Sequence, residues 1–213
     1  MLLDFEDIIE KYNLKITGVI HVGAHHGQEH ERYTKSGVER VAYFEPVHSV
    51  FEKLQENLKS FSDTSANCHV STYNFALGNE NRKVEMFVEK NDHYGCSSIL
   101  KPSSNYDHIP FLKNQTVEMK RLDDVGLSGS FNFLNIDVQG YKLEVMKGAS
   151  KTLESIDYVM CEINRITPRK KLDYDGASLI ENVSNFLSSY GFTLVEENWA
   201  GVSWGDGFFI KSE

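Results

Sequence analysis

Acidic residues and glycines follow several short apolar runs of this sequence. The segment Gly23-Ala24-His25-His26-Gly27 follows one such run, and Glu45, Asp137 and Glu162 each stand at the end of another. Glycines in a turn let a ligand approach the backbone, and the helix that follows offers free N–H groups. Carboxylates at strand ends bind hydroxyls, cations or protons, because an unpaired buried charge is too costly. These residues predict a binding site for a polar ligand.

The glycine segment and Glu45 together indicate a nucleotide-type cofactor. An acidic residue at the end of the second strand can accept hydrogen bonds from both ribose hydroxyls, which suits NAD and S-adenosylmethionine (SAM) alike. A dinucleotide fingerprint requires a second glycine where this chain has His25, and that side chain leaves little room for pyrophosphate. We therefore favour SAM. A structural turn, with Glu45 as a helix-capping acid before Pro46, is the alternative interpretation.

Asp137 has three chemical roles open to it: a contact to the ammonium group of SAM, a metal ligand, or a catalytic base. With Glu162 on the neighbouring strand end it would offer hard oxygen ligands to Mg²⁺, which would bring an acceptor hydroxyl closer to its alkoxide. His93 and His108, in a long polar segment, are further candidates for the base. Asp137 as a helix N-terminal acid and Glu162 as a polar rim residue are the structural alternatives.

The remaining histidines give weaker indications. His21 lies inside a strand-like run, where a hydrogen-bonded core histidine is the more common finding. His25 and His26 are adjacent and would point in different directions on a helix, so we do not expect them to bind one metal together.

Alternating helices and strands must position these side chains. Apolar residues at helical spacing predict helices, and short apolar or alternating runs predict strands. The expected helices cover residues 1–15, 28–35, 48–61, 141–153 (with a break near Gly148) and 178–190. The expected strands cover residues 16–22, 40–45, 70–77, 83–89, 116–122, 131–138, 157–163, 192–196 and 207–211. The polar segment 91–114 has the length of an active-site loop.

This order predicts an α/β fold with a doubly wound, mainly parallel sheet and helices on both faces. The last two strands have no helix between them, so we expect an antiparallel hairpin at one edge. In such a sheet the ligand crevice lies beyond the carboxyl ends of the strands, where the acidic residues stand. The length suits one ordinary domain, and we expect residues 1–213 to form it.

Composition and charge narrow the choice of partners. The net charge is −9 and the pI is about 5.4, so a basic face for a phosphate backbone is not expected and nucleic acid is a poor candidate. Three cysteines without a CxxC pair fit a reducing compartment. Neither a signal peptide nor an apolar run of about 20 residues is evident, so we expect a cytoplasmic protein without a membrane partner.

Several ordered blocks of the sequence resemble the FkbM-type methyltransferases. They span roughly Gly18 to Asn164, and the block around Asp137, which ends in Lys-Gly-Ala, is the most specific. The resemblance implies the class I SAM-methyltransferase fold, which is Rossmann-like, and O-methylation of sugar or polyketide hydroxyls. The blocks are Val19-Ile20-His21-Val22-Gly23-Ala24-His25-His26-Gly27-Gln28-Glu29, Tyr43-Phe44-Glu45-Pro46, Ala76-Leu77-Gly78, Ser97-Ser98, Leu122-Asp123-Asp124-Val125 and Asn135-Ile136-Asp137-Val138-Gln139-Gly140-Tyr141-Lys142-Leu143-Glu144-Val145-Met146-Lys147-Gly148-Ala149.

The resemblance also implies roles for individual residues. Gly23, Ala24 and Gly27 would hold the methionine part of SAM, Glu45 its ribose, and Ala76 would line the adenine site. His21 and Gln139 stand where many relatives carry Asp and Glu, which removes carboxyl groups near the cofactor. The implied cofactor-binding residues also include six that stand at strand ends or in the middle loop: His21, Pro46, Ser97, Ser98, Asp137 and Gln139.

These observations predict a SAM-dependent O-methyltransferase that acts on a hydroxyl of a sugar, a glycan or a small metabolite. Positioning would do much of the work of the in-line transfer, with Asp137 or a loop histidine as the base. The alternatives are an NAD-dependent oxidoreductase and a degenerate methyltransferase fold kept as a binding module. The presence of both Glu45 and Asp137 argues against the module. Acceptor contacts are expected from residues 91–114 and 164–175.

Overall fold

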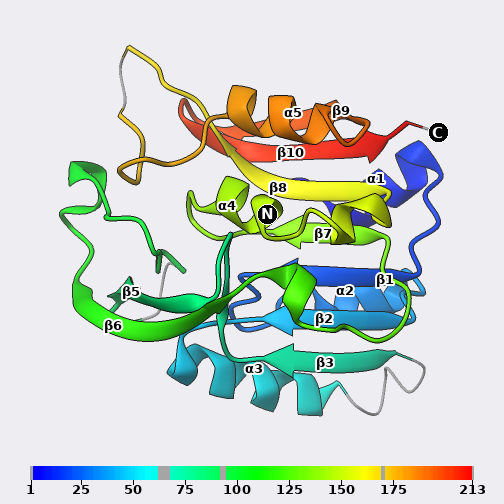
Figure 1. The fold of residues 1–213 in the computed structure, drawn as a ribbon, viewed down its shortest axis with the longest axis horizontal. Helices are drawn as coiled ribbons and strands as arrows, with labels where there is room; N and C mark the ends of the chain where they lie inside the picture. Colours follow the sequence, from blue (N-terminus) through cyan, green and yellow to red (C-terminus); the bar gives the residue numbers. More distant parts are fainter. Residues whose placement is uncertain (1, 62–67, 92–94, 169–170, 213) are drawn as a thin grey trace.

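The computed structural model describes residues 2–61, 68–91, 95–168 and 171–212. Its main feature is a seven-stranded sheet whose parallel strands all end on the same side of the molecule (Figure 1). From one edge to the other the strands are β3 (His69–Tyr73), β2 (Arg40–Phe44), β1 (Gly18–Val22), β7 (Phe133–Ile136), β8 (Tyr158–Asn164), β10 (Trp204–Lys211) and β9 (Phe192–Ala200).

The directions of the strands confirm the predicted fold class. Strands β3, β2, β1, β7 and β8 run parallel to one another, whereas β10 is antiparallel to both β8 and β9. Parallel neighbours need a crossover connection, whereas the short turn at Gly201 joins β9 and β10 directly into a hairpin. Both hairpin strands are longer than their apolar segments predict, because the ladder continues to the pair Trp204–Ala200.

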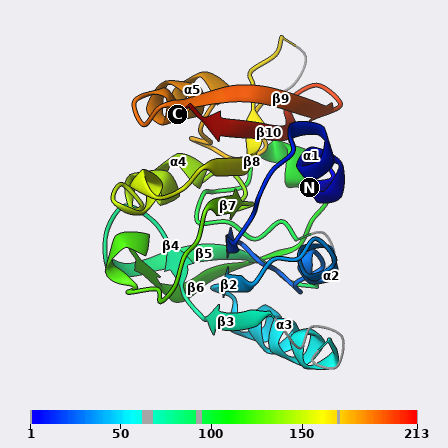
Figure 2. The ribbon, with the colours of Figure 1, turned by 90° about the vertical axis from the view of Figure 1, so that its right-hand side faces the viewer.

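Helices cover both faces of this sheet (Figure 2). Helices α1 (Phe5–Tyr12), α2 (His30–Lys35) and α3 (His48–Ser60) lie on one face, and α4 (Lys142–Lys147) and α5 (Ile180–Ser188) lie on the other. The buried core includes Phe5, Tyr33 and Leu54 on the first side and Met146 and Leu187 on the second. Burying each large apolar side chain contributes about 1.5–3 kcal/mol, so both layers hold the strand ends in place. No helix within the described ranges is long and apolar enough to cross a membrane.

A second sheet forms where the sequence predicts one continuous third strand. After β3, Asn74 donates from Nδ2 to the carbonyl oxygens of Glu45 (2.9 Å) and Pro46 (3.2 Å), so the ladder does not continue. The expected strand 70–77 therefore splits, and its second part becomes β4 (Ala76–Leu77). Strand β4 pairs with β6 (Phe111–Lys120), which also pairs with β5 (Arg82–Glu89).

The second sheet shortens the loop that the sequence predicts at residues 91–114. Strand β6 begins at Phe111 rather than at the expected Thr116, and the loop contains a 3₁₀ turn, η1 (Ser104–Tyr106). The expected alternation in β5 is confirmed, since Val84 is buried and Glu85 is exposed. In Figure 1 this loop and the segment after β8 both lie on the side where the parallel strands end.

Asp123 anchors the chain after the predicted break near Gly148. Helix α4 ends at Lys147, and the 3₁₀ turn η3 (Thr152–Glu154) follows. Oδ1 of Asp123 accepts hydrogen bonds from the backbone N–H and the hydroxyl of Thr152, both at 2.9 Å, and Oδ2 accepts from the N–H of Lys151 at 3.0 Å. The Asp123 side chain is fully buried. This residue therefore has a structural role within its sequence block.

We expect Asp123→Ala to lower the free energy of unfolding by about 2–4 kcal/mol, because buried N–H groups lose their acceptor. Asp123→Asn keeps one acceptor oxygen and should lose less. Urea denaturation followed by circular dichroism measures both variants. Equal stability of the native protein and Asp123→Ala would contradict the anchoring role.

Candidate functional site

The strand register brings three predicted site residues to one level. Val22 of β1 pairs with Phe44 of β2 on one side and with Ile136 of β7 on the other. The next residue of each strand therefore leaves the sheet at the same height, at its carboxyl edge. These three residues are Gly23, Glu45 and Asp137.

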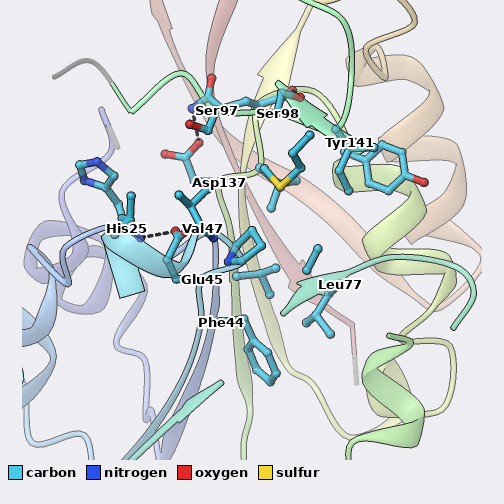
Figure 3. Close-up of a pocket in the computed structure, with 18 of the residues that line it drawn as sticks. His25, Phe44, Glu45, Val47, Leu77, Ser97, Ser98, Asp137 and Tyr141 are labelled. Carbon is cyan, nitrogen blue, oxygen red and sulfur yellow. Dashed lines mark hydrogen bonds between the residues drawn. The ribbon is translucent and has the colours of Figure 1, made fainter. Parts of the chain in front are cut away.

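A cavity opens directly beyond these three residues (Figure 3). About 640 Å³ of space between the lining atoms, part of it open solvent, lies in this cavity. One part of the wall is apolar, and another carries two carboxylates. The sequence-predicted cofactor residues that line the cavity are Gly23, Glu45, Pro46, Ala76, Ser97, Ser98, Asp137 and Gln139.

Gly23 permits the close approach of β1 and β7 at the cavity. Its φ is +79°, and a Cβ built on it would lie 1.8 Å from the carbonyl oxygen of Asp137. Its N–H donates to the carbonyl oxygen of Phe44 at 2.9 Å. Only glycine combines this conformation with the absence of a side chain, so the position is restricted by geometry.

Two backbone N–H groups hold the carboxylate of Glu45. Oε2 accepts from the N–H of His25 at 3.0 Å, and Oε1 accepts from the N–H of Val47 at 2.9 Å. A carboxylate has about four acceptor sites, so these contacts fix its orientation and remain compatible with hydrogen bonds from a diol. The residue is only 6% exposed. The arrangement is suited to binding two neighbouring hydroxyls.

Asp137 faces the same cavity with a raised pKa. Burial raises the pKa of Asp137 to about 7, and the negative charge of Glu162 acts in the same direction. Gln139 donates from Nε2 to Oδ1 of Asp137 at 3.0 Å. A carboxyl group with a pKa near neutrality can take up a proton, and a nearby cation favours its charged form. Asp137 can therefore serve as a base or bind a cationic ligand.

The segment that contains Ser97 and Ser98 crosses the cavity beside Asp137 (Figure 3). Ser98 forms two backbone hydrogen bonds with Phe87, of 2.8 and 3.0 Å, and its hydroxyl donates to the carbonyl oxygen of Gln139 at 2.8 Å. The hydroxyl oxygen of Ser97 accepts from the N–H of Glu89 at 3.0 Å. The segment is thereby anchored on β5 and on the turn that follows β7.

His21, Ala24 and Gly27 do not line the cavity, contrary to the implied cofactor contacts. His21 is 2% exposed, its Nδ1 lies 3.1 Å from the Tyr33 hydroxyl, and burial lowers its pKa. It is therefore a hydrogen-bonded core histidine. Ala24 is buried in the core on the same face of the sheet, and Gly27 lies in a turn against Leu54. Ala24 and Gly27 therefore face the core beneath α2 and α3, whereas His25 between them lines the cavity.

His25 lines the cavity and stacks on His26. Their ring centroids lie 3.9 Å apart, and the ring planes differ by 28°. The expectation that the two rings point in different directions held only for a helix, and it does not apply because α2 begins at His30 and both residues lie in the preceding turn. His25 has a φ of +47°. Sequence reasoning treated His25 only as an obstacle to pyrophosphate and missed it as a lining residue.

No observation in the described ranges supports the predicted Mg²⁺ site of Asp137 and Glu162. Glu162 is buried away from the cavity lining. Its Oε2 accepts from the N–H of Gly140 at 3.3 Å, and its Oε1 accepts from Nδ2 of Asn164 at 2.9 Å. Across the described ranges, no group of three or more His, Cys, Asp or Glu side chains is arranged to hold a metal ion. Glu162 instead supports the turn after Asp137.

The structure describes only one of the two loop histidines that were predicted as bases. His93 lies outside the described residues. His108 is exposed, does not line the cavity, and has its ring centroid 6.5 Å from that of Tyr106. Of the predicted catalytic residues that the structure describes, Asp137 is the one at the cavity.

Sequence reasoning missed the apolar wall of the cavity. Phe44, Val47, Leu77, Met86 and Tyr141 contribute to it. Leu77 and Met86 belong to the second sheet, whose position the sequence does not reveal. Phe44 could have been predicted as a lining residue, because it directly precedes Glu45. Such a wall suits the planar ring of a nucleoside base.

Comparison with known proteins adds independent evidence. The sequence model of the methyltransferase FkbM domain matches residues 21–194 of this 213-residue chain. The matched range includes the glycine segment, Glu45 and Asp137. No curated protein sequence matches the chain at a significant level.

Solved methyltransferase structures share the fold at low sequence identity. The FkbM methyltransferase from Methylobacillus flagellatus KT superposes with a TM-score of 0.62 at 15% identity over 91% of this chain, which spans 43% of that protein's length. Magnesium protoporphyrin IX methyltransferase from Synechocystis PCC 6803, solved with bound SAM, gives a TM-score of 0.54 at 9% identity. The match covers 96% of this chain and 74% of that protein. A SAM-dependent methyltransferase from Aquifex aeolicus gives a TM-score of 0.50 at 12% identity. The match covers 99% of this chain and 91% of that protein.

These matches bear on the two cofactor classes that the residues left open, SAM and NAD. The structural matches show the class I methyltransferase fold, and the sequence model covers most of the chain. The chain belongs to the FkbM family of SAM-dependent methyltransferases.

Proposed function

We propose that this protein transfers the methyl group of SAM to a hydroxyl group of a sugar, a glycan or another small metabolite. The observation that carries the proposal is the pair Glu45 and Asp137 on the wall of one partly apolar cavity. SAM supplies an electrophilic methyl group on a positively charged sulfur atom. A carboxylate placed for a diol, and a second one with a pKa near 7, match the polar groups of this cofactor.

The cavity lining fits the parts of SAM one by one. Glu45 would accept hydrogen bonds from the ribose hydroxyls, and Phe44, Val47 and Leu77 would pack on the adenine. Asp137 would face the positively charged part of the cofactor. No lysine or arginine occurs among the described residues that line this cavity.

Asp137 is also the proposed general base for the acceptor hydroxyl. A base works best when its pKa lies near the working pH, and the pKa of Asp137 is raised to about 7. Holding the acceptor in line with the methyl group supplies much of the remaining rate enhancement. The sugar or glycan class of acceptor rests on the resemblance to FkbM-type enzymes. The net charge of −9 disfavours nucleic acid as the acceptor.

Titration calorimetry with SAM and S-adenosylhomocysteine, each with and without Mg²⁺, tests the cofactor part of the proposal. We expect about micromolar binding of both ligands. A panel of deoxysugars, assayed by formation of S-adenosylhomocysteine, then tests the acceptor class. Absence of cofactor binding under every condition would overturn the enzyme proposal and favour a binding module.

We expect the affinity for SAM to rise with pH up to about 7 and to level off above it. The pKa of Asp137 is raised to about 7, so the group is mostly protonated below that pH. A cationic ligand favours the carboxylate, so binding releases up to one proton and Kd falls by up to about tenfold per pH unit. Calorimetry in buffers of different ionisation enthalpy measures the released proton.

Asp137→Asn is the control for this pH dependence. It removes the titrating group while keeping the shape, so the proton release should disappear and the remaining affinity should vary little between about pH 5.5 and 7. A native pH dependence that survives in Asp137→Asn would assign the effect to another group, such as His25.

A further inference from the structure

Gln139 occupies an unusual backbone position directly after the Asp137–Val138 pair. Its φ is +51°, and Gly140 follows with a φ of +95°. A glutamine in the left-handed region is uncommon, and such positions persist only where the surroundings determine them strongly. The carbonyl oxygen of Gln139 accepts from the Ser98 hydroxyl at 2.8 Å, and the N–H of Ser178 donates to the carbonyl oxygen of Gly140 at 3.1 Å. The turn is therefore tied to two separate segments.

The contacts of the Gln139 side chain fix the orientation of its amide. Nε2 donates to Oδ1 of Asp137 at 3.0 Å, and Oε1 lies 3.4 Å from the hydroxyl of Tyr174, which donates to it. A charged carboxylate oxygen only accepts, so Asp137 favours the orientation in which the amide nitrogen of Gln139 faces it. With the amide turned over, Oε1 would face the carboxylate of Asp137 and the two oxygens would repel each other.

Tyr174 belongs to a cover that lies over this turn. The cover consists of residues 95–106 and 171–178, two segments far apart in the sequence. Their backbones are joined by hydrogen bonds from the N–H of Ser103 to the carbonyl oxygen of Asp173 and from the N–H of Asp175 to that of Lys101, both 2.9 Å. Tyr174 is 1% exposed, and its hydroxyl shares one proton between the carbonyl oxygen of Cys96 at 2.8 Å, the stronger bond, and Oε1 of Gln139 at 3.4 Å. It therefore links both cover segments to Gln139.

We propose that Gln139 is a positioning residue for Asp137 and that Tyr174 orients Gln139, so that the closed cover holds the Asp137 carboxylate in place. The proposal rests on the proposed function only in giving Asp137 a role toward SAM. Neither Gln139 nor Tyr174 needs to touch the acceptor. The amide of Gln139 donates a hydrogen bond to the charged form of Asp137, and this contact opposes the effect of burial on that group.

Three carboxylates around Asp137 act against its charged form, whereas the positive charge of the N-terminus favours it. Glu162 on β8, Asp206 on β10 and Glu29 before α2 all raise the pKa of Asp137 through their negative charge. Glu45 and His25 line the same cavity from the ends of β2 and β1. Among the described neighbours, the Gln139 amide is a hydrogen-bond donor aimed directly at the carboxylate. Removing it should therefore change the titration of Asp137 measurably.

The test measures the pKa of Asp137 in the cofactor-free protein, from the ¹³C shift of its side-chain carboxyl group across a pH series. Gln139→Leu removes the donor at similar size and should raise the pKa by about one unit. Gln139→Glu places a second carboxyl group next to Asp137, so the pair should share a proton and titrate higher still. Tyr174→Phe removes one hydroxyl and should raise the pKa by less than Gln139→Leu does.

Tyr12→Phe is the matched control for Tyr174→Phe. The Tyr12 hydroxyl also donates to a backbone carbonyl oxygen, that of Val195 at 3.1 Å, but it lies on α1 outside the cover. This control should leave the pKa of Asp137 at its native value. An unchanged pKa in Gln139→Leu would overturn the whole proposal, and an unchanged pKa in Tyr174→Phe alone would overturn the role of Tyr174.

The same variants separate this proposal from the proposed function. Because the titration needs no cofactor, its outcome does not depend on SAM binding. If the native protein fails to bind SAM while the pKa of Asp137 still rises in Gln139→Leu, the positioning role stands and the proposed function falls. If the native protein binds SAM and the pKa of Asp137 does not change in Gln139→Leu, the positioning role falls and the proposed function stands.

Discussion

Glu45→Ala should weaken the binding of SAM and of S-adenosylhomocysteine by about 100-fold, with the same factor for both ligands. Both carry the same ribose, and Glu45 is the carboxylate placed for its two hydroxyls. Hydrogen bonds to a charged acceptor contribute about 1.5–3 kcal/mol each, so the loss of two corresponds to at least this factor. The N–H groups of His25 and Val47 also lose their acceptor, which disturbs the cavity wall.

Two further variants sharpen this result. Glu45→Gln keeps the shape but must turn its NH₂ group toward the N–H of either His25 or Val47, so it should lose about tenfold or more. Glu56→Gln changes an exposed glutamate of α3 and should bind like the native protein. Titration calorimetry gives all the values. Native affinity in Glu45→Ala would show that the ribose does not bind at this carboxylate.

Gly23→Ala should destabilise the protein by about 3–5 kcal/mol and abolish measurable cofactor binding. The added Cβ would lie 1.8 Å from the carbonyl oxygen of Asp137, and φ at this position is +79°. That oxygen belongs to the backbone directly after β7, so relief of the clash requires β1 and β7 to separate. The movement would shift Asp137 itself, which is why stability and binding should fall together.

Gly37→Ala is a matched control for Gly23→Ala, because it separates conformational strain from the steric clash. Gly37 has nearly the same φ, +77°, but a Cβ there would meet nothing within 4 Å. We expect it to lose only about 1 kcal/mol and to bind SAM normally. Urea denaturation of both variants measures the difference. Equal stability of Gly23→Ala and Gly37→Ala would mean that the contact with Asp137 does not restrict position 23.

Most of the main sheet could be predicted from local patterns. The helix over 48–61 and the strand over 40–44 follow from apolar spacing that is visible within a few residues. The third strand was predicted incorrectly, because the bonds from Asn74 to the carbonyls of Glu45 and Pro46 divert the chain there. An apolar run cannot show which of two sheets its backbone will join.

The sequence predicted those site residues for which both the residue type and the place at a strand end leave few possible roles. Gly23, Glu45 and Asp137 were found in this way, and all three line the cavity. His21 was implied to bind the cofactor because of its place in a sequence block, but its side chain points into the core and contacts Tyr33. Two neighbouring residues of one turn can face opposite sides of a sheet, and a block of sequence does not distinguish them.

The sequence by itself determined the order of helices and strands and the carboxylates that end β2 and β7, because these depend on residue type and short-range spacing. Only the tertiary structure decided that Glu162 supports the turn after Asp137, and that Tyr174 lies beside Gln139. Both outcomes depend on contacts between segments far apart in the chain. Backbone geometry and packing select such contacts from many that the sequence alone would allow.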